Sequence, residues 1–162
     1  MTFRDLDLPA PVLRGIDAAE FTICTPIQEA TLPLALKGKD VAGQSQTGTG
    51  KTAAFLIAAF TRCLRAPAPP PGSVTAPRVL IIAPTRELTV QIEADARLLG
   101  QFTGLRVLSV YGGIDYGKQR EALRERCDVL VGTPGRLIDY LKQNVWSPRK
   151  VEVLVIDEAD RM

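Results

Sequence analysis

Four short apolar runs constrain the fold of this chain more than any other feature. Each run is rich in Val, Ile and Leu and lacks the polar alternation of a half-exposed strand. Such runs suit strands that are buried on both faces, as in a parallel sheet. They occupy residues 78–83, 105–110, 128–131 and 151–156.

Segments with helical spacing follow or separate these runs, at residues 51–64, 86–99, 117–126 and 134–143. Alternating strands and helices predict an α/β fold in which helices flank a mostly parallel sheet through right-handed crossovers. With 162 residues, of which 46% are hydrophobic, the chain is long enough for one such domain with a core and too short for two.

One segment, residues 66–77, breaks the alternation because five of its twelve residues are proline. Neither a helix nor an inner strand can form there. The segment is either a proline-rich ligand for a partner or a stiff connection between a helix and a strand, and the connection is favoured.

The amino-acid composition limits which kinds of catalytic and metal-binding site the chain can form. The chain has no histidine, which excludes His-based triads and His metal ligands, so catalysis must use carboxylates, lysine, arginine or a bound metal. Cys24, Cys63 and Cys127 have no metal-site spacing and are expected to be buried thiols in a reducing compartment. A net charge of +2 permits a nucleic-acid partner without requiring one.

No signal peptide or membrane span is visible, which predicts a cytoplasmic protein.

The stretch SQTGTGKT, residues 45–52, predicts a phosphate-binding loop. Residues 40–43 (DVAG) are expected to form the strand before it, and a helix follows. Backbone N–H groups would wrap the β- and γ-phosphates, Lys51 would neutralise them, and the Thr52 hydroxyl would reach Mg²⁺. Ser45 stands where the strict pattern has glycine. The alternative, a plain glycine turn before a helix, is disfavoured by the Gly-Lys-Thr ending.

An acidic motif near the C-terminus adds a second feature of a nucleotide-hydrolysing site. The run at 153–156 leads directly into Asp157-Glu158-Ala159-Asp160. Asp157 is expected to hold the Mg²⁺ shell through water, and Glu158 to take a proton from the attacking water. The alternative is that these acids only favour the N-terminus of a following helix.

With these motifs the chain resembles the DEAD-box ATP-dependent RNA helicases over nearly its whole length. Residues 21–28 (FTICTPIQ) are similar to the family's Q motif, with Phe3 as the upstream aromatic. The resemblance implies that Gln28 reads the adenine edge and that the aromatic packs on the ring. It implies a catalytic set of Lys51, Asp157 and Glu158, and an ATP site made of Phe3, Phe21, Thr25, Gln28, Gln46, Thr47, Gly48, Thr49, Gly50, Lys51, Thr52 and Asp160.

Three further motifs, each after a predicted strand, resemble the family's RNA-contacting motifs Ia, GG and Ib. The resemblance implies contacts to the sugar–phosphate backbone, indifferent to base sequence, with 2′-OH contacts favouring RNA. The residues are Pro84, Thr85, Arg86, Gly112, Gly113, Thr133, Pro134, Gly135 and Arg136. Thr-Pro-Gly-Arg alone is an ordinary helix start.

The resemblance also implies the domain organisation. Residues 1–40 are the Q-motif region, and residues 41–162 form a RecA-like P-loop ATPase domain that is incomplete at its C-terminus. A central strand carrying a Ser-Ala-Thr motif and a second RecA-like domain are missing from these 162 residues. We therefore expect this chain alone to be unstable or to aggregate.

The predicted function is ATP-dependent unwinding of short RNA duplexes, with ATP and Mg²⁺ as cofactors and RNA as partner. The motifs look most like those of bacterial members that work with the RNA degradosome, which implies a role in RNA turnover and a ribonuclease partner bound through the second domain. The alternative is a non-catalytic product that binds nucleotide or RNA weakly. A P-loop kinase or transporter ATPase does not account for the other motifs.

Aromatic residues outside these motifs carry two interpretations. Trp146 could stack on a base, but a half-buried cap on the sheet edge is favoured. Tyr116 and Lys118 could contact RNA or simply begin a solvated helix.

Overall fold

The computed structural model describes residues 1–162, which form two compact units. The first unit contains Met1–Pro67 and Asp95–Gly104, and the second contains Ala68–Ala94 and Leu105–Met162. Helix α4 (Arg86–Leu99) contributes its first part to the second unit and its last part to the first.

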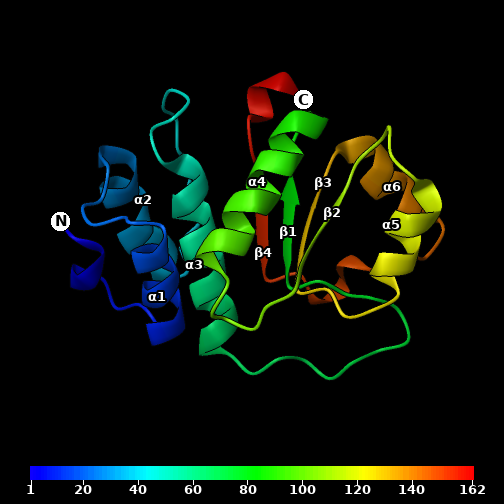
Figure 1. Cartoon of the computed structure of the whole chain (residues 1–162), viewed down its shortest axis with the longest axis horizontal. Coiled ribbons are helices and arrows are strands. Elements are labelled where there is room, and N and C mark those ends of the chain that lie inside the picture. The colour runs from blue at the N-terminus through cyan, green and yellow to red at the C-terminus, as the bar shows by residue number, and fades with distance from the viewer. The chain divides into compact units, whose positions relative to one another are not determined.

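The second unit is built on a sheet of four parallel strands in the order β2-β3-β1-β4 (Figure 1). The strands are β1 (Val79–Ile82), β2 (Val107–Val110), β3 (Val129–Gly132) and β4 (Val153–Ile156). All four lie inside the predicted apolar runs except that β3 extends to Gly132. The predicted α/β class with a parallel sheet is confirmed.

The sheet is most deeply buried at its two inner strands, β1 and β3. Val79, Ile81, Val129 and Val131 are fully buried on one face of the sheet. Leu80 and Leu130, which are paired in the register of β1 and β3, point to the other face. On that second face lies a core cluster of Leu80, Val110, Leu123, Cys127, Leu130, Leu137, Tyr140 and Trp146. The burial on both faces explains why these runs lack polar alternation.

Strand β4 differs because it is an edge strand that pairs only with β1. Leu154 and Ile156 on this strand are 56% and 51% exposed. An exposed apolar edge strand is a site for association with other chains. The expectation that the isolated chain is unstable or aggregates stays a prediction, and β4 is the feature that favours it.

Two helices complete the second unit, α5 (Tyr116–Leu123) and α6 (Pro134–Lys142), with the single 3-10 turns η2 (Pro148–Lys150) and η3 (Ala159–Arg161). Asp115 caps α5 by accepting a hydrogen bond of 3.0 Å from the Lys118 N–H. Pro134 begins α6, where its missing N–H costs nothing.

Trp146 lies in the core cluster and is only 3% exposed. Its Nε1 donates to the Leu137 carbonyl at 2.9 Å, so the one polar atom of the side chain is satisfied inside the protein. The structural interpretation of this residue is therefore confirmed, although burial is deeper than the half-buried position that was expected.

The first unit contains the 3-10 turn η1 (Phe3–Asp5) and the helices α1 (Ala10–Ala18), α2 (Pro26–Leu36) and α3 (Lys51–Arg65). Helix α3 buries one apolar side, including Leu56, Ile57 and Phe60. Gly15 on α1 approaches the last turn of α4 so closely that an added Cβ would lie 1.9 Å from the Leu99 carbonyl oxygen. Only glycine fits at this helix contact.

The expected strand at residues 40–43 is absent, and this prediction was wrong. Residues 39–46 form neither helix nor strand, and residues 41–44 are exposed. A strand needs a neighbour to pair its backbone N–H and C=O groups, and none of the four strands pairs with this segment. The loop at residues 45–52 is therefore preceded by exposed chain without regular secondary structure.

The proline-rich segment forms no helix or regular strand, as predicted. It is tied to the second unit at Thr75, whose carbonyl accepts the Ser147 N–H at 2.8 Å and whose hydroxyl donates to the Leu123 carbonyl. These contacts favour a structural connection over a free peptide ligand. No helix in the chain combines the length and apolar character that crossing a membrane requires.

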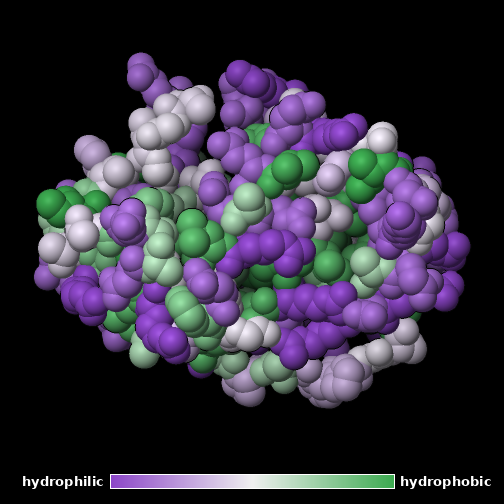
Figure 2. Space-filling model, viewed as in Figure 1, coloured by the Kyte–Doolittle hydropathy of each residue, from purple (hydrophilic) through white to green (hydrophobic).

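The surface in the same view is mainly polar (Figure 2). Apolar side chains reach it in separate places among polar ones. Scattered apolar residues of this kind are usual on a protein surface and mark no single docking patch on this face.

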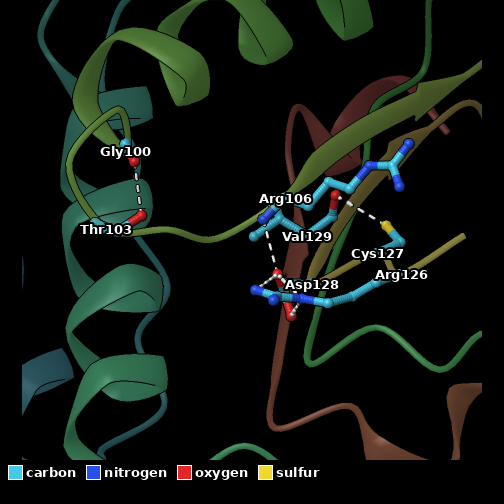
Figure 3. A network of polar contacts seen from close by, with 7 residues as sticks. All are labelled: Gly100, Thr103, Arg106, Arg126, Cys127, Asp128 and Val129. Carbon is cyan, nitrogen blue, oxygen red and sulfur yellow. Dashed lines mark hydrogen bonds and ion pairs between the residues drawn. The ribbon is translucent and has the colours of Figure 1, made fainter. Parts of the chain in front are cut away.

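All three cysteines are free and buried, as predicted. Cys127 lies just before β3, and its thiol donates to the Val129 carbonyl at 3.4 Å (Figure 3). The neighbouring Asp128 carboxylate accepts two hydrogen bonds of 2.7 Å, one from the Arg106 N–H and one from the Arg126 guanidinium. Burial, with a smaller contribution from Asp128, raises the pKa of Cys127 from 9.0 to about 12. The thiol is therefore protonated throughout the neutral range.

Cys127 is accordingly expected to resist alkylation by iodoacetamide in the native protein at pH 8, because the thiolate is the reactive form and a raised pKa removes it. Mass spectrometry after timed labelling checks this, with the urea-unfolded protein as the reference that labels quickly. Raising the pH to 9.5 should speed labelling of the unfolded protein much more than of the native one. Equal rates in both states would show that the thiol is not buried as described.

Candidate functional site

The loop at residues 45–52 has the backbone of an anion cradle. Gly48 and Gly50 have φ angles of 81° and 90°, a left-handed conformation that side chains rarely adopt. Gly50 directly precedes α3, so the loop delivers its N–H groups to a helix N-terminus. This arrangement suits a phosphate, because unpaired N–H groups and the positive end of the helix dipole face the same ligand.

Hydrogen bonds within the loop keep it in this shape. Thr49 Oγ1 donates to the Gln46 carbonyl at 2.7 Å and accepts from Ser45 Oγ at 2.6 Å. Lys51 Nζ folds back to the Ser45 carbonyl at 2.7 Å. Ser45, the departure from the strict pattern, therefore braces the loop, and the Lys51 ammonium lies against it.

The predicted adenine-binding residues meet the loop through Gln28. The Gln28 amide accepts the Thr25 N–H at 2.9 Å and donates to the Gly50 carbonyl at 3.1 Å, and the residue is only 3% exposed. The φ of 90° favours glycine at position 50, and a Cβ there would lie 2.4 Å from Gln28 Nε2, so the Gln28 amide would have to move. Thr25 Oγ1 is buried beside the same atoms and faces the Gln28 N–H in a capping box, without a hydrogen bond of normal geometry.

This orphaned hydroxyl is the observation that fits a nucleotide or a bound water next to the loop, because a buried polar atom is normally paired. In the present conformation the Gln28 amide is committed to two backbone groups. Its role in reading adenine stays a prediction.

The aromatic pair of the same region is arranged differently from what the sequence indicates. Phe3 and Phe21 stack with their ring centroids 6.4 Å apart. Phe3 is only 2% exposed, whereas Phe21 is 40% exposed. The exposed Phe21 ring is therefore accessible to a ligand, and the buried Phe3 ring packs against Phe21.

In the second unit, the acidic motif begins where β4 ends. The Asp157 N–H continues the ladder to β1 by donating to the Ile82 carbonyl at 2.9 Å. Glu158 follows with a φ of 50°, unusual for a residue with a side chain. Its carboxylate is half-buried and lies 3.3 Å from the exposed Arg161 guanidinium, while Asp160 is exposed.

Such backbone strain is often found at functional residues, where it aims a side chain. The acidic motif directly follows strand β4 and runs into the 3-10 turn η3. Its role in hydrolysis stays a prediction.

The predicted RNA-binding motifs follow the carboxyl ends of β1, β2 and β3, and the parallel sheet brings these ends to one edge of the second unit (Figure 1). Thr85 caps α4 by accepting the Leu88 N–H at 3.2 Å. The exposed Arg86 guanidinium lies 5.6 Å from the centre of the Tyr111 ring, and a Cβ on Gly113 would lie 2.9 Å from Arg86 Nη1. Motifs Ia and GG are thus in contact.

The Ib arginine is held by aromatic rings in the same unit. The Arg136 guanidinium lies 4.9 Å from the Tyr116 ring centre and 5.6 Å from that of Tyr140. Tyr140 is fully buried, and its hydroxyl donates to the Tyr116 carbonyl at 2.6 Å. Tyr116 begins α5, as the structural interpretation expects, and its ring also packs against Arg136. Contact of Tyr116 with RNA stays a prediction.

Three residues of this edge were not predicted from sequence. The Tyr111 ring packs against the Arg86 guanidinium, and the Tyr140 ring packs against that of Arg136. Gln119 forms hydrogen bonds with the Tyr111 backbone. A buried glutamine on a short helix has no sequence signature of its own. The aromatic residues could have been found only by placing them next to arginines in space.

A cavity of about 330 Å³ lies in the first unit at the C-terminal ends of α2 and α3, at the opposite end of α3 from Lys51. Basic side chains line it, but Arg65 donates to the Leu36 carbonyl at 3.0 Å and so caps α2. Cations at helix C-termini are expected on dipole grounds. The cavity therefore needs no ligand to explain its charges.

No group of three or more His, Cys, Asp or Glu side chains converges in the structure to hold a metal. The predicted roles of Thr52 and Asp157 toward Mg²⁺ stay predictions.

Comparison with known proteins gives a consistent result. The DEAD/DEAH box helicase family model matches residues 25–162. The chain is similar to proteins named ATP-dependent RNA helicase RhlB from Xanthomonas oryzae pv. oryzae, with 55% identity over 100% of this chain and 28% of that protein. It is similarly related to those of Shewanella denitrificans, with 52% identity over 99% of this chain and 37% of the relative, and of Sodalis glossinidius, with 54%, 99% and 39%. The chain thus spans between 28% and 39% of the length of these three relatives.

Proposed function

Because this chain belongs to the DEAD/DEAH box helicase family, we propose that the whole protein is an ATP-dependent RNA helicase. ATP binding and hydrolysis would drive the separation of short RNA duplexes. The observation that carries this proposal is the preformed phosphate-binding loop, with its two left-handed glycines and with Lys51 folded against it.

The first unit would supply nucleotide binding. N–H groups of residues 46–52 would bind the β- and γ-phosphates, the Lys51 ammonium would neutralise them, and the Thr52 hydroxyl would contribute to Mg²⁺ binding. Phe21, Thr25 and Gln28 would bind the adenine, with the exposed Phe21 ring as the stacking face and the orphaned Thr25 hydroxyl as a polar contact. Phe3 would contribute by packing against the Phe21 ring and holding it in place.

Hydrolysis would use the acidic motif. Glu158 would accept a proton from a water that attacks the γ-phosphorus, and the bond to the β,γ-bridging oxygen would break to give ADP and phosphate. Asp157 would orient Mg²⁺ through water, and the metal would supply charge neutralisation of the phosphates. The strained backbone at Glu158 supports this role because it fixes the direction of the side chain.

The edge of the second unit would bind RNA through its backbone. The exposed Arg86 and the half-buried Arg136 offer two guanidinium groups, and the helix starts at Thr85 and Thr133 offer N–H groups. Such contacts bind phosphates and sugars and carry little base information. Binding should therefore be nearly independent of sequence and should weaken with salt.

We also propose a role in cytoplasmic RNA turnover, with a degradosome ribonuclease bound through a second RecA-like domain. This rests on the likeness of residues 41–56 and 132–144 to the degradosome-associated members of the family. Co-purification of a ribonuclease with the tagged protein from its own cells tests it, and a partner set without any ribonuclease would contradict it.

Unwinding itself is tested with a short RNA duplex carrying a fluorophore and a quencher. The proposal predicts strand separation by the whole protein with ATP and Mg²⁺, and none with ADP. A matched DNA duplex should be separated more slowly, because 2′-OH contacts are lost. ATP-independent separation, or none at saturating protein, would contradict a helicase function.

A further inference from the structure

Gln119 is a buried polar residue that no proposed step uses. It lies on α5, is 6% exposed and has both ends of its amide engaged. Gln119 Oε1 accepts the Tyr111 N–H at 2.7 Å, and Gln119 Nε2 donates to the Tyr111 carbonyl at 3.1 Å. The side chain thus pairs with the Tyr111 backbone as a neighbouring strand would, one residue after β2 ends.

The two hydrogen bonds fix the segment that supports Arg86. The Tyr111 ring lies under the Arg86 guanidinium, with 5.6 Å between the Arg86 Cζ atom and the ring centre. Two residues later Gly113, with a φ of 86°, passes so close that any Cβ would lie 2.9 Å from Arg86 Nη1. A ring below and a backbone beside the guanidinium restrict where it can point.

Arg86 itself is exposed, and its guanidinium faces the Tyr111 ring rather than a carboxylate. Its position is set by the Tyr111 ring and the Gly113 backbone, both of which depend on the turn after β2. An arginine that is held in place in this way is ready to bind a phosphate, because less side-chain freedom is lost on binding.

We propose that Gln119 is a positioning residue for RNA binding, which acts by clamping the Tyr111 backbone so that Tyr111 and Gly113 hold Arg86 toward the RNA phosphate. This inference rests on the proposed function. Gln119 does not touch RNA in this account. Its effect passes entirely through Arg86.

A double-mutant cycle on the whole protein tests the proposal, with fluorescein-labelled oligouridylate as the probe. Gln119→Ala removes two backbone partners and is expected to weaken RNA binding about tenfold, the equivalent of about 1.4 kcal/mol. Arg86→Ala should weaken binding by at least as much. In the Arg86→Ala background, Gln119→Ala should add less than about twofold, because the group through which it acts is gone.

Controls separate positioning from general damage. Gln101→Ala removes an exposed glutamine in the first unit, which donates only to the Leu98 carbonyl, and should leave RNA affinity unchanged. ATP affinity should stay close to the parental value in Gln119→Ala, and RNA binding is compared at a temperature well below the melting point of each variant. If that variant does not fold, Gln119→Met runs the same cycle, because it keeps an unbranched side chain of similar length and removes both hydrogen bonds without adding a charge.

The outcomes distinguish this inference from the proposed function. Full RNA affinity in Gln119→Ala, or a further tenfold loss in the Arg86→Ala background, would overturn the positioning role while leaving the RNA surface intact. Full RNA affinity in Arg86→Ala would overturn the assignment of this edge to RNA, and the positioning role with it.

Discussion

Lys51→Ala is expected to weaken ATP binding about a hundredfold and thereby abolish hydrolysis at ordinary ATP concentrations. The Lys51 ammonium lies on the phosphate-binding loop, 2.7 Å from the Ser45 carbonyl. Removing one partner of a closely held charge pair typically costs about 2–5 kcal/mol, and each 1.4 kcal/mol is a tenfold change in affinity. The loop backbone should survive, because the Ser45 to Thr49 and Thr49 to Gln46 hydrogen bonds do not involve Lys51.

Equilibrium binding of a fluorescent ATP analogue measures this effect. Lys39→Ala is the matched control, because it removes the same charge from an exposed position ahead of the loop and should bind ATP normally. Parental affinity in Lys51→Ala would mean that the loop does not bind phosphate as described.

Glu158→Gln is expected to separate binding from chemistry. The amide has the shape of the carboxylate but cannot accept a proton from water, so hydrolysis should fall by about 10²–10⁴-fold. ATP affinity should stay within about twofold of the parental value, because this account gives Glu158 no contact to the ground-state phosphates. The lost ion pair with Arg161 should matter little, because the arginine is exposed and such pairs are weak.

Single-turnover hydrolysis and ATP binding on the same preparation test this prediction. Glu121→Gln serves as control, since Glu121 pairs with Arg124 on the surface of α5 and its loss removes one equal charge. Hydrolysis at the parental rate in Glu158→Gln would assign the general base elsewhere, whatever its effect on affinity.

The sheet of the second unit was largely predictable because its strands are buried on both faces. An apolar run of this kind has few alternatives, and the observed strands fall within two residues of the predicted bounds. The segment at 40–43 shows the limit of that argument. Its four residues look like the start of a strand, but a strand also needs a partner, which a local pattern does not reveal.

The helices of residues 1–36 escaped prediction for a different reason. Helix α1 carries Pro11 at its start and Gly15 in its interior, and α2 contains Pro33. These residues weaken the helical signal in the sequence, whereas tertiary packing supports the helices in the structure. Gly15 is even required, since α4 approaches it closely.

The candidate site divides in the same way. Residues that act through the backbone, such as Gly48 and Gly50, were predictable because glycine at these positions has few other uses. Residues that act through neighbours were not. The burial of Phe3 under Phe21 and the pairing of Gln119 with Tyr111 depend on contacts between segments that are far apart or unmarked in the sequence.

The most direct test of the whole account is the rate of phosphate release from ATP by the whole protein, measured with and without single-stranded RNA. We predict slow release alone and a severalfold or larger increase with RNA, lost in both Lys51→Ala and Glu158→Gln. A rate that does not respond to RNA, or that persists in those variants, would contradict an RNA-dependent ATPase built from this loop and this acidic motif.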